Sequence, residues 1–170
     1  MAANFELDAR PSIPDLPDKL EEVREEAAVI LPPWPRDADL LRFAPEGMET
    51  PYRFYIDGKN LRVDPRGSEV HYTLVIEAAN GTRNVSYEGI RCDLRGTFKI
   101  FAYGNDGRFT RTTAADWKPI PGLGSEAYRA DLHRFRFCIQ RETRAQPLKD
   151  IQRALRGRAS GNNAADFQAQ

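Results

Sequence analysis

Apolar and polar side chains alternate most regularly between residues 69 and 103. Positions 70, 72, 74 and 76 form one apolar row, and positions 71, 73, 75 and 77 form a mixed row. This period of two predicts a strand with one face in a core. Asn80-Gly81 follows, and both residues tolerate the positive φ of a tight primed turn, so we expect a hairpin whose second strand covers residues 84–88 until Gly89 interrupts it. After a loop through Gly96, residues 97–103 predict a third antiparallel strand.

Shorter alternating runs predict further strands. Residues 52–56 turn at Asp57-Gly58 and return over 61–63 as a hairpin, residues 40–43 and 108–112 suit sheet edges, and residues 135–138 suit a last short strand. Trp34, on the proline-rich stretch 32–35, is expected to pack against the sheet, and docking of an aromatic-lined partner there is the alternative.

Apolar residues recur at helical spacing near both ends of the chain. Residues 18–31 predict one helix, a short helical stretch follows Ser125, and a last helix begins after Pro147 with the apolar stripe Leu148, Ile151 and Leu155. The fold class predicted is therefore α+β: an antiparallel β-sheet meander of about five to seven strands with flanking N-terminal and C-terminal helices.

The length of 170 residues suits one domain. We expect an extended arm over residues 1–16, a single globular domain over 17–157 and a disordered tail over 158–170. No apolar run in the sequence suits a membrane span or a signal peptide. Membrane association is therefore expected only through a leader or lipid anchor outside this sequence.

Charge is balanced overall, with 25 basic and 25 acidic residues, so bulk attraction to nucleic acid is not expected. Acidic residues nevertheless crowd the start of the chain and arginines crowd its end. In one interpretation the two ends are solvated faces that complement each other. In the other, the C-terminal arginines form a surface for an anionic partner, and the candidates are Arg129, Arg134, Arg136, Arg141, Arg144 and Arg153.

Cys92 and Cys138 are the only cysteines, and His71 and His133 are the only histidines. A zinc site would need all four at spacings that match no zinc module, so no metal is predicted. In an oxidising compartment we expect a disulfide, which by closing about 46 residues would contribute roughly 4 kcal/mol in the loop-entropy model. Two buried free thiols are the alternative.

No nucleophile elbow, phosphate loop or dinucleotide fingerprint occurs, so neither a cofactor nor a catalytic motif is predicted. Four side chains on or beside the central hairpin are the weak catalytic candidates: Glu77, Glu88, His71 and Arg91. If Glu77 and Glu88 approach each other, they could perform the acid–base chemistry of a small hydrolase. Polar residues on the wet face of an antiparallel sheet are the simpler interpretation. The many aromatic side chains suit a core, or alternatively a groove that binds a small ligand.

The strings NVSYEGIRC (residues 84–92) and KIFAYG (residues 99–104), followed by Asp106-Gly107, resemble the CNP-one-like family of cryptic neisserial proteins. Further matching pieces are RFYID (53–57), YTLV (72–75) and Phe137-Cys138, so the resemblance spans residues 43–155. It implies a bacterial envelope protein made with a signal sequence or lipoprotein leader, with both cysteines at positions the family also carries. That supports a disulfide formed in the periplasm, and it brings no activity or cofactor.

Together these observations predict a non-catalytic interaction or structural protein of the periplasm or cell envelope, whose partner is another envelope protein. A small-ligand-binding protein with an aromatic groove is the alternative, and a hydrolase that uses Glu77 and Glu88 is the third hypothesis.

Overall fold

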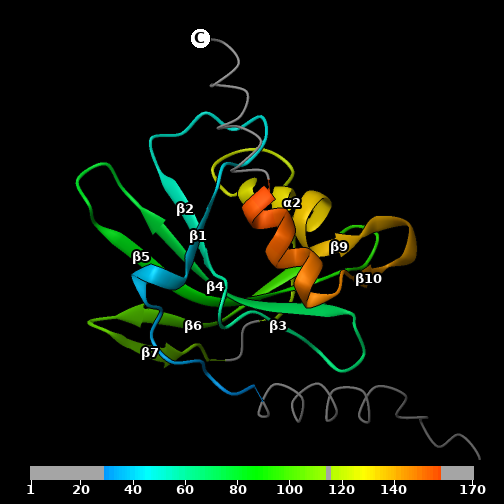
Figure 1. Cartoon of the computed structure of the whole chain (residues 1–170), viewed down its shortest axis with the longest axis horizontal. Coiled ribbons are helices and arrows are strands. Elements are labelled where there is room, and N and C mark those ends of the chain that lie inside the picture. The colour runs from blue at the N-terminus through cyan, green and yellow to red at the C-terminus, as the bar shows by residue number, and fades with distance from the viewer. Residues whose placement is uncertain (1–28, 114–115, 158–170) are drawn as a thin grey trace, which may run out of the picture. The chain divides into compact units, whose positions relative to one another are not determined.

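An antiparallel β-sheet forms the centre of the part of the chain that the computed structural model describes, residues 29–113 and 116–157 (Figure 1). Its strands are β1 (Leu40–Phe43), β2 (Arg53–Asp57), β3 (Arg62–Val63), β4 (Glu69–Glu77), β5 (Arg83–Arg91), β6 (Thr97–Asn105), β7 (Arg108–Arg111) and β8 (Lys118–Pro119). Neighbours follow the order β1-β2-β4-β5-β6-β7, with β3 beside β4 and β8 beside β6. The predicted α+β class is confirmed, in a sheet of 8 strands.

The described residues from Leu31 onward belong to one compact unit. The arm predicted over residues 1–16, the predicted N-terminal helix up to residue 28 and the tail over residues 158–170 lie outside the described residues.

β4 and β5 pair along their whole length, from Glu69 opposite Arg91 to Glu77 opposite Arg83. The predicted apolar row of β4 is buried on one face, and its mixed row lies on the other. Gly89 does not interrupt β5, because the strand continues to Arg91. A Cβ atom at Gly89 would lie 2.8 Å from the Phe101 ring, so this glycine makes room for an aromatic neighbour.

The pairing of β5 with β6 contains a bulge. Tyr87 lies opposite Ala102 and Glu88 opposite Ile100, so Phe101 is the extra residue. A bulge increases the local twist and changes the direction of a side chain. Here it supports the placement of Phe101 on the face that Tyr87 occupies, where the two ring centroids are 5.8 Å apart.

The turn at Asn80-Gly81 is longer than the predicted two-residue primed turn. Gly81 has a φ of +87°, and its N–H donates to the carbonyl of Ala78. Asn80 instead accepts a hydrogen bond from the Thr82 N–H through its side chain. The primed geometry occurs at the next hairpin, where Asp106 and Gly107 both have positive φ.

The hairpin predicted over residues 52–63 is wrong. β2 and β3 both pair antiparallel with β4, so they run in the same direction as two successive strands along one side of β4. The Asp57 side chain accepts hydrogen bonds from the N–H groups of Lys59 and Asn60, which closes a small loop without reversing the chain. Turn-forming residues alone do not distinguish such an interruption from a hairpin.

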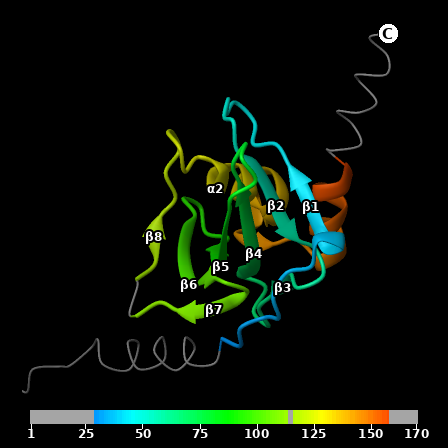
Figure 2. The same cartoon turned by 90° about the vertical axis from the view of Figure 1, so that its left-hand side faces the viewer.

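The C-terminal segment covers one face of the sheet (Figures 1 and 2). It comprises α2 (Tyr128–Asp131), the π-helix η2 (Leu132–Phe137), β9 (Cys138–Ile139), the 3-10 turn η3 (Gln140–Glu142), β10 (Arg144–Ala145) and a helix over residues 148–157; another 3-10 turn, η1 (Asp37–Asp39), precedes β1. The strand predicted over residues 135–138 is therefore wrong except at its end. Leu132, Arg136 and Phe137 are the deeply buried residues, at a spacing of four and five that suits a wide helical turn.

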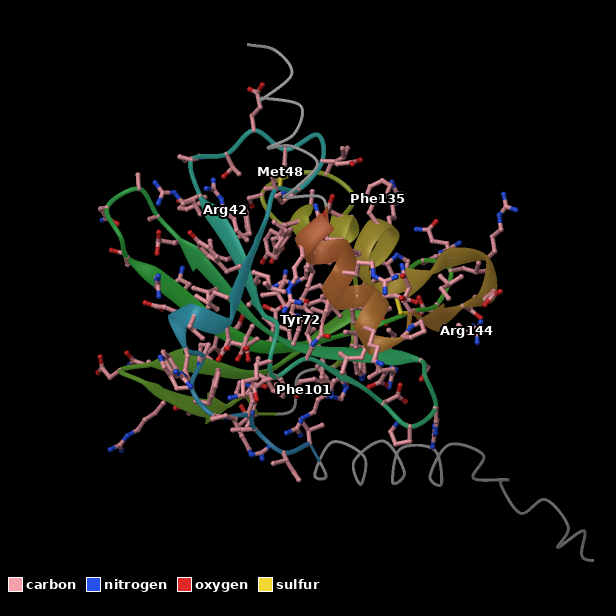
Figure 3. The ribbon with its side chains drawn as sticks, in the orientation of Figure 1. Arg42, Met48, Tyr72, Phe101, Phe135 and Arg144 are labelled. Carbon is pink, nitrogen blue, oxygen red and sulfur yellow. A yellow bond between two sulfur atoms is a disulfide. The ribbon has the colours of Figure 1, made fainter. Side chains whose placement is uncertain are left out.

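Each face of the sheet has its own aromatic layer. Under the helices, Phe54 contacts Tyr128 and Tyr72 contacts Phe137, each at a centroid distance of 5.0 Å. The opposite face carries what we call the aromatic row: Trp34, Phe109, Tyr87, Phe101 and Trp117, whose successive ring centroids lie 5.2 to 6.4 Å apart. Figure 3 shows Tyr72 and Phe101 on opposite sides of the sheet. The predicted packing of Trp34 against the sheet is confirmed.

A disulfide joins Cys92, directly after β5, to Cys138, the first residue of β9. Both cysteines are buried and the bond spans 46 residues. It attaches the covering segment to the sheet at the end of the π-helix.

Candidate functional site

Glu88 lies opposite Tyr72 on the face that the helices cover, and its side chain is 1% exposed. The Tyr72 hydroxyl donates to its Oε1 at 3.0 Å, and the Ser86 hydroxyl donates to its Oε2 at 2.6 Å. Arg129 of α2 donates from Nε to Oε1 at 2.8 Å and from Nη2 to Oε2 at 3.1 Å. Each oxygen of this carboxyl group therefore accepts two hydrogen bonds, in the bidentate geometry that arginine favours.

Arg129 is almost as fully buried as Glu88, with 4% of its side chain exposed. Its guanidinium carbon lies 4.1 Å from the ring centroid of Phe98, and its Nη1 donates to Glu126 at 2.9 Å. Burial lowers the pKa of Arg129, but the hydrogen bond and charge of Glu88 outweigh burial and raise that pKa overall. Burial, and then the charge of Glu88, raise the pKa of Tyr72. The four-residue cluster of Tyr72, Ser86, Glu88 and Arg129 thus fixes α2 to the sheet.

The structure does not bring Glu77 and Glu88 together. Glu77 lies opposite Arg83, five positions beyond Tyr72 along β4, and therefore on the other face of the sheet. It forms ion pairs with Arg83 at 2.7 Å and Arg53 at 3.4 Å. The expected carboxylate pair is wrong, because the register of the hairpin assigns the two side chains to different faces.

His71 and Arg91 do come together, through a residue that sequence reasoning missed. Glu69 is bonded through Oε2 to Nε2 of His71 at 2.9 Å and accepts a hydrogen bond at Oε1 from Nε of Arg91 at 3.0 Å. The guanidinium carbon of Arg91 lies 4.0 Å from the centroid of Trp117, at one end of the aromatic row. The sequence could have revealed this contact, because Glu69 and His71 lie two positions apart on one face of β4 and the hairpin register puts Arg91 opposite Glu69.

Opposing effects act on the Glu69 carboxyl group. Burial raises its pKa, but the hydrogen bonds and charges of His71 and Arg91 outweigh burial and lower that pKa overall. A carboxylate that orients an imidazole is part of many acid–base sites. Here both oxygens are engaged by neighbours, which makes Glu69 a link between strands β4 and β5.

The aromatic row packs as a layer. Tyr87 is 1% exposed and Phe101 8% exposed, and each contacts rings on either side. Rings that contact one another fill the space that a ligand would need. The packing therefore favours the core interpretation of these side chains over a ligand groove.

Two of the six candidate partner-binding arginines are not on the surface. Arg129 belongs to the cluster around Glu88, and Arg136 donates from Nε to Asp131 at 2.7 Å and from Nη2 to the carbonyl of Ala44 at 3.0 Å. Both side chains are almost completely buried. Their assignment to an exposed basic surface is wrong, because each compensates a buried carboxylate.

The family of the protein follows from a match over residues 19–156, which is more than half of the chain. The chain belongs to the CNP1-like family. The resemblance noted in the sequence is thereby confirmed, and the matched region contains the Glu88 cluster, the Glu69 link and both cysteines. No curated protein and no solved structure gave a match. The description of the family names no reaction or ligand.

The other four candidate partner-binding arginines are exposed: Arg134, Arg141, Arg144 and Arg153. Arg144 lies at the outer end of the β9–β10 hairpin, paired with Glu142 (Figure 3). Arg153, 79% exposed, lies 3.6 Å from Asp150.

A groove of about 430 Å³ opens on the helix over residues 148–157. It is lined by Lys149, Gln152, Arg153, Arg156 and Gly157, and we call it the basic groove.

Within residues 29–113 and 116–157, no group of three or more His, Cys, Asp or Glu side chains is arranged to hold a metal ion. In the same part of the chain, no helix has the length and apolar character needed to cross a membrane.

Proposed function

We propose that this CNP1-like protein is an exported, non-catalytic protein of the bacterial cell envelope that acts by binding a partner. Export is supported by the Cys92–Cys138 disulfide, because such bonds persist in oxidising compartments and are rare in the cytosol. The family resemblance, which implies a protein of the bacterial envelope, agrees with this proposal.

The non-catalytic role is supported mainly by the surroundings of the Glu88 carboxylate, whose two oxygens already accept hydrogen bonds from neighbouring side chains. A general acid or base must reach a proton on its substrate, directly or through one water. Glu88 is 1% exposed and accepts four hydrogen bonds from its own chain. Its geometry is that of a group that holds the fold together.

The partner surface we propose is formed by the exposed arginines Arg134, Arg141, Arg144 and Arg153. Arginine is favoured in interfaces because its planar guanidinium binds carboxylates with defined geometry. An envelope protein with an acidic patch would complement this surface and would associate faster at low salt.

Crosslinking of the full-length protein in its native envelope, followed by mass spectrometry, tests the binding role. We expect one reproducible protein partner, lost when all four arginines are replaced by glutamine. A control variant replaces two other exposed arginines, Arg108 and Arg111 of β7, and should retain the partner. Equal capture by both variants would contradict the proposed surface, and absence of any partner would contradict the binding role.

Thiol alkylation tests the compartment separately. Protein taken directly from the cell envelope, with thiols trapped during lysis, should contain no free thiol. Two free thiols in the trapped protein would contradict export.

A further inference from the structure

The β9–β10 hairpin, residues 138–145, buries little side-chain surface of its own. Within these residues, all of which the structure describes, only Cys138 and Ala145 are buried. Residues 140–144 are exposed, and Figure 1 shows the hairpin projecting from the covering segment. Because alanine buries a single methyl group, the hydrophobic attachment of the hairpin is weak without Cys138.

The backbone attaches the hairpin to the sheet only lightly. The N–H of Ala145 donates to the carbonyl of Gly67, in the loop before β4, at 2.7 Å. The two residue pairs of the β9–β10 ladder, and the bond from the Gln146 N–H to the carbonyl of Phe137, join the hairpin to itself. A two-stranded hairpin is marginally stable by itself in water. The disulfide to Cys92 is therefore its principal attachment to the sheet.

The segments on either side of the hairpin are held without the disulfide. Before it, Arg129 of α2 forms the buried ion pair with Glu88. After it, Ile151 and Leu155 of the last helix are fully buried. Loss of the S–S bond should therefore release the hairpin and leave both flanking segments docked, which is a local opening within a folded domain.

Backbone strain favours the open form of the hairpin. Thr143, at the end of its turn, has a φ of 48° and a ψ of 41°. A β-branched residue seldom adopts this left-handed conformation. Opening relieves the strain, so the strained turn persists only while other contacts hold the hairpin closed.

We propose that the Cys92–Cys138 disulfide is a redox latch for the partner surface. In the oxidised protein the hairpin is ordered and presents Arg141 and Arg144, two of the four arginines of that surface. In the dithiol form the hairpin is detached from a folded sheet, and ordering its arginines opposes binding. The regulation of the surface rests on the proposed function, whereas the latch itself does not.

Oxidation closes the latch by thiol–disulfide exchange. The two thiols lose two electrons and two protons as the S–S bond forms, and a disulfide-bearing oxidant of the envelope takes them up and becomes a dithiol. Both cysteines are buried in the product, which keeps reductants from the bond. The surface is thus completed once, after export, and stays complete.

Limited digestion with trypsin measures the opening, because the protease cuts after Arg141 and Arg144 of the hairpin. The test compares the oxidised full-length wild type with the full-length double variant Cys92→Ala, Cys138→Ala, which needs no reductant. We expect cleavage at these two arginines to be at least about tenfold faster in the variant, since cleavage follows the population of the open form. Mass spectrometry identifies the first fragments.

Two controls separate the latch from other effects. Arg108 and Arg111 of β7, which are also exposed, should be cut at equal rates in both proteins. Wild type purified under dithiothreitol retains both sulfur atoms, and hydrogen exchange over residues 138–146 should be faster in it than in the oxidised protein. Agreement with the double variant excludes the cavity left by alanine as the cause of opening.

Equal cleavage of the hairpin in the oxidised wild type and the double variant, or equal hydrogen exchange of the reduced and oxidised wild type, would overturn the latch. Early cleavage after Arg83 and Arg91 of β5 would overturn it as well, because the whole sheet would then have opened.

Envelope crosslinking tests the regulation. The double variant should capture less partner than the wild type, and equal capture would overturn the regulation. Absence of any partner for the wild type would contradict the proposed function, and the digestion would still decide whether the latch exists.

Discussion

Replacing Glu88 by glutamine removes the buried carboxylate that compensates Arg129 and leaves only the exposed Glu126 as its ionic partner. The side chain of Arg129 is 4% exposed, and two of its hydrogen bonds go to Glu88. Removing one partner of a buried ion pair typically costs about 3–5 kcal/mol. Since whole domains are stable by roughly 5–15 kcal/mol, the Glu88→Gln variant should lose a large fraction of its stability.

The assay is urea unfolding followed by tryptophan fluorescence and circular dichroism, with the disulfide intact. Glu126→Gln is the matched control, because Glu126 contacts the same arginine from a 53% exposed position. An exposed pair of this kind contributes about 0–1 kcal/mol, so the control should unfold close to the wild type. Glu88→Gln should unfold at clearly lower urea with an unchanged slope.

The double variant Glu88→Met with Arg129→Met distinguishes the loss of the whole ion pair from the loss of one partner. Replacing both charges by apolar groups of similar size is often neutral or stabilising, so the double variant should be more stable than Glu88→Gln alone. If Glu88→Gln unfolds within about 1 kcal/mol of the control, the structural interpretation of this cluster is wrong, since removal of a buried partner costs more than that. A hydrolytic role for Glu88 would predict that result, together with loss of an activity.

Other perturbations test separate parts of the fold. Gly89→Ala should lower the melting temperature, because its Cβ would lie 2.8 Å from Phe101 and such overpacking costs about 1–3 kcal/mol of stability. Gly122→Ala, whose Cβ would have nothing within 4 Å, is the control, and equal melting of the two variants would contradict the packing. Reducing the disulfide should destabilise the protein by roughly 4 kcal/mol, measured by urea unfolding with and without reductant, and an unchanged midpoint would refute this. Because the folded-state pKa of Glu69 is lowered, its contribution is present above its ordinary pKa of 4.5 and is lost as pH falls through the folded value. Stability measured from pH 6 down to about 2 should therefore fall more steeply in wild type than in Glu69→Gln, and parallel curves would rule the link out.

The local pattern predicted the central hairpin because alternation along β4 agrees with the burial of its two faces. The same pattern could have placed Glu88 in the core. The register that pairs Glu77 with Arg83 puts Glu88 opposite Tyr72, which belongs to the buried apolar row of β4. The sequence-based interpretation missed this burial, because it assigned the polar residues of β5 to the solvent-exposed face.

The remaining differences come from contacts that are distant in sequence. Arg129 lies 41 residues from Glu88, and Arg136 lies 92 residues from Ala44, so no local pattern marks either arginine as buried. The alternation of arginine and phenylalanine over residues 134–137 has the period of a strand, but the docking of Leu132 and Phe137 against the sheet imposes a helix. Tertiary packing overrides the pattern at these positions.

The single disulfide also determines how the chain can oxidise. With two cysteines there is one possible intramolecular pairing, so folding needs an oxidant but no reshuffling of incorrect bonds. Cys138 follows directly after the π-helix, so docking of the covering helices on the sheet holds the two sulfur atoms within bonding distance. In the folded protein the covalent bond therefore keeps the covering segment next to the end of β5, even when the noncovalent contacts between them open locally.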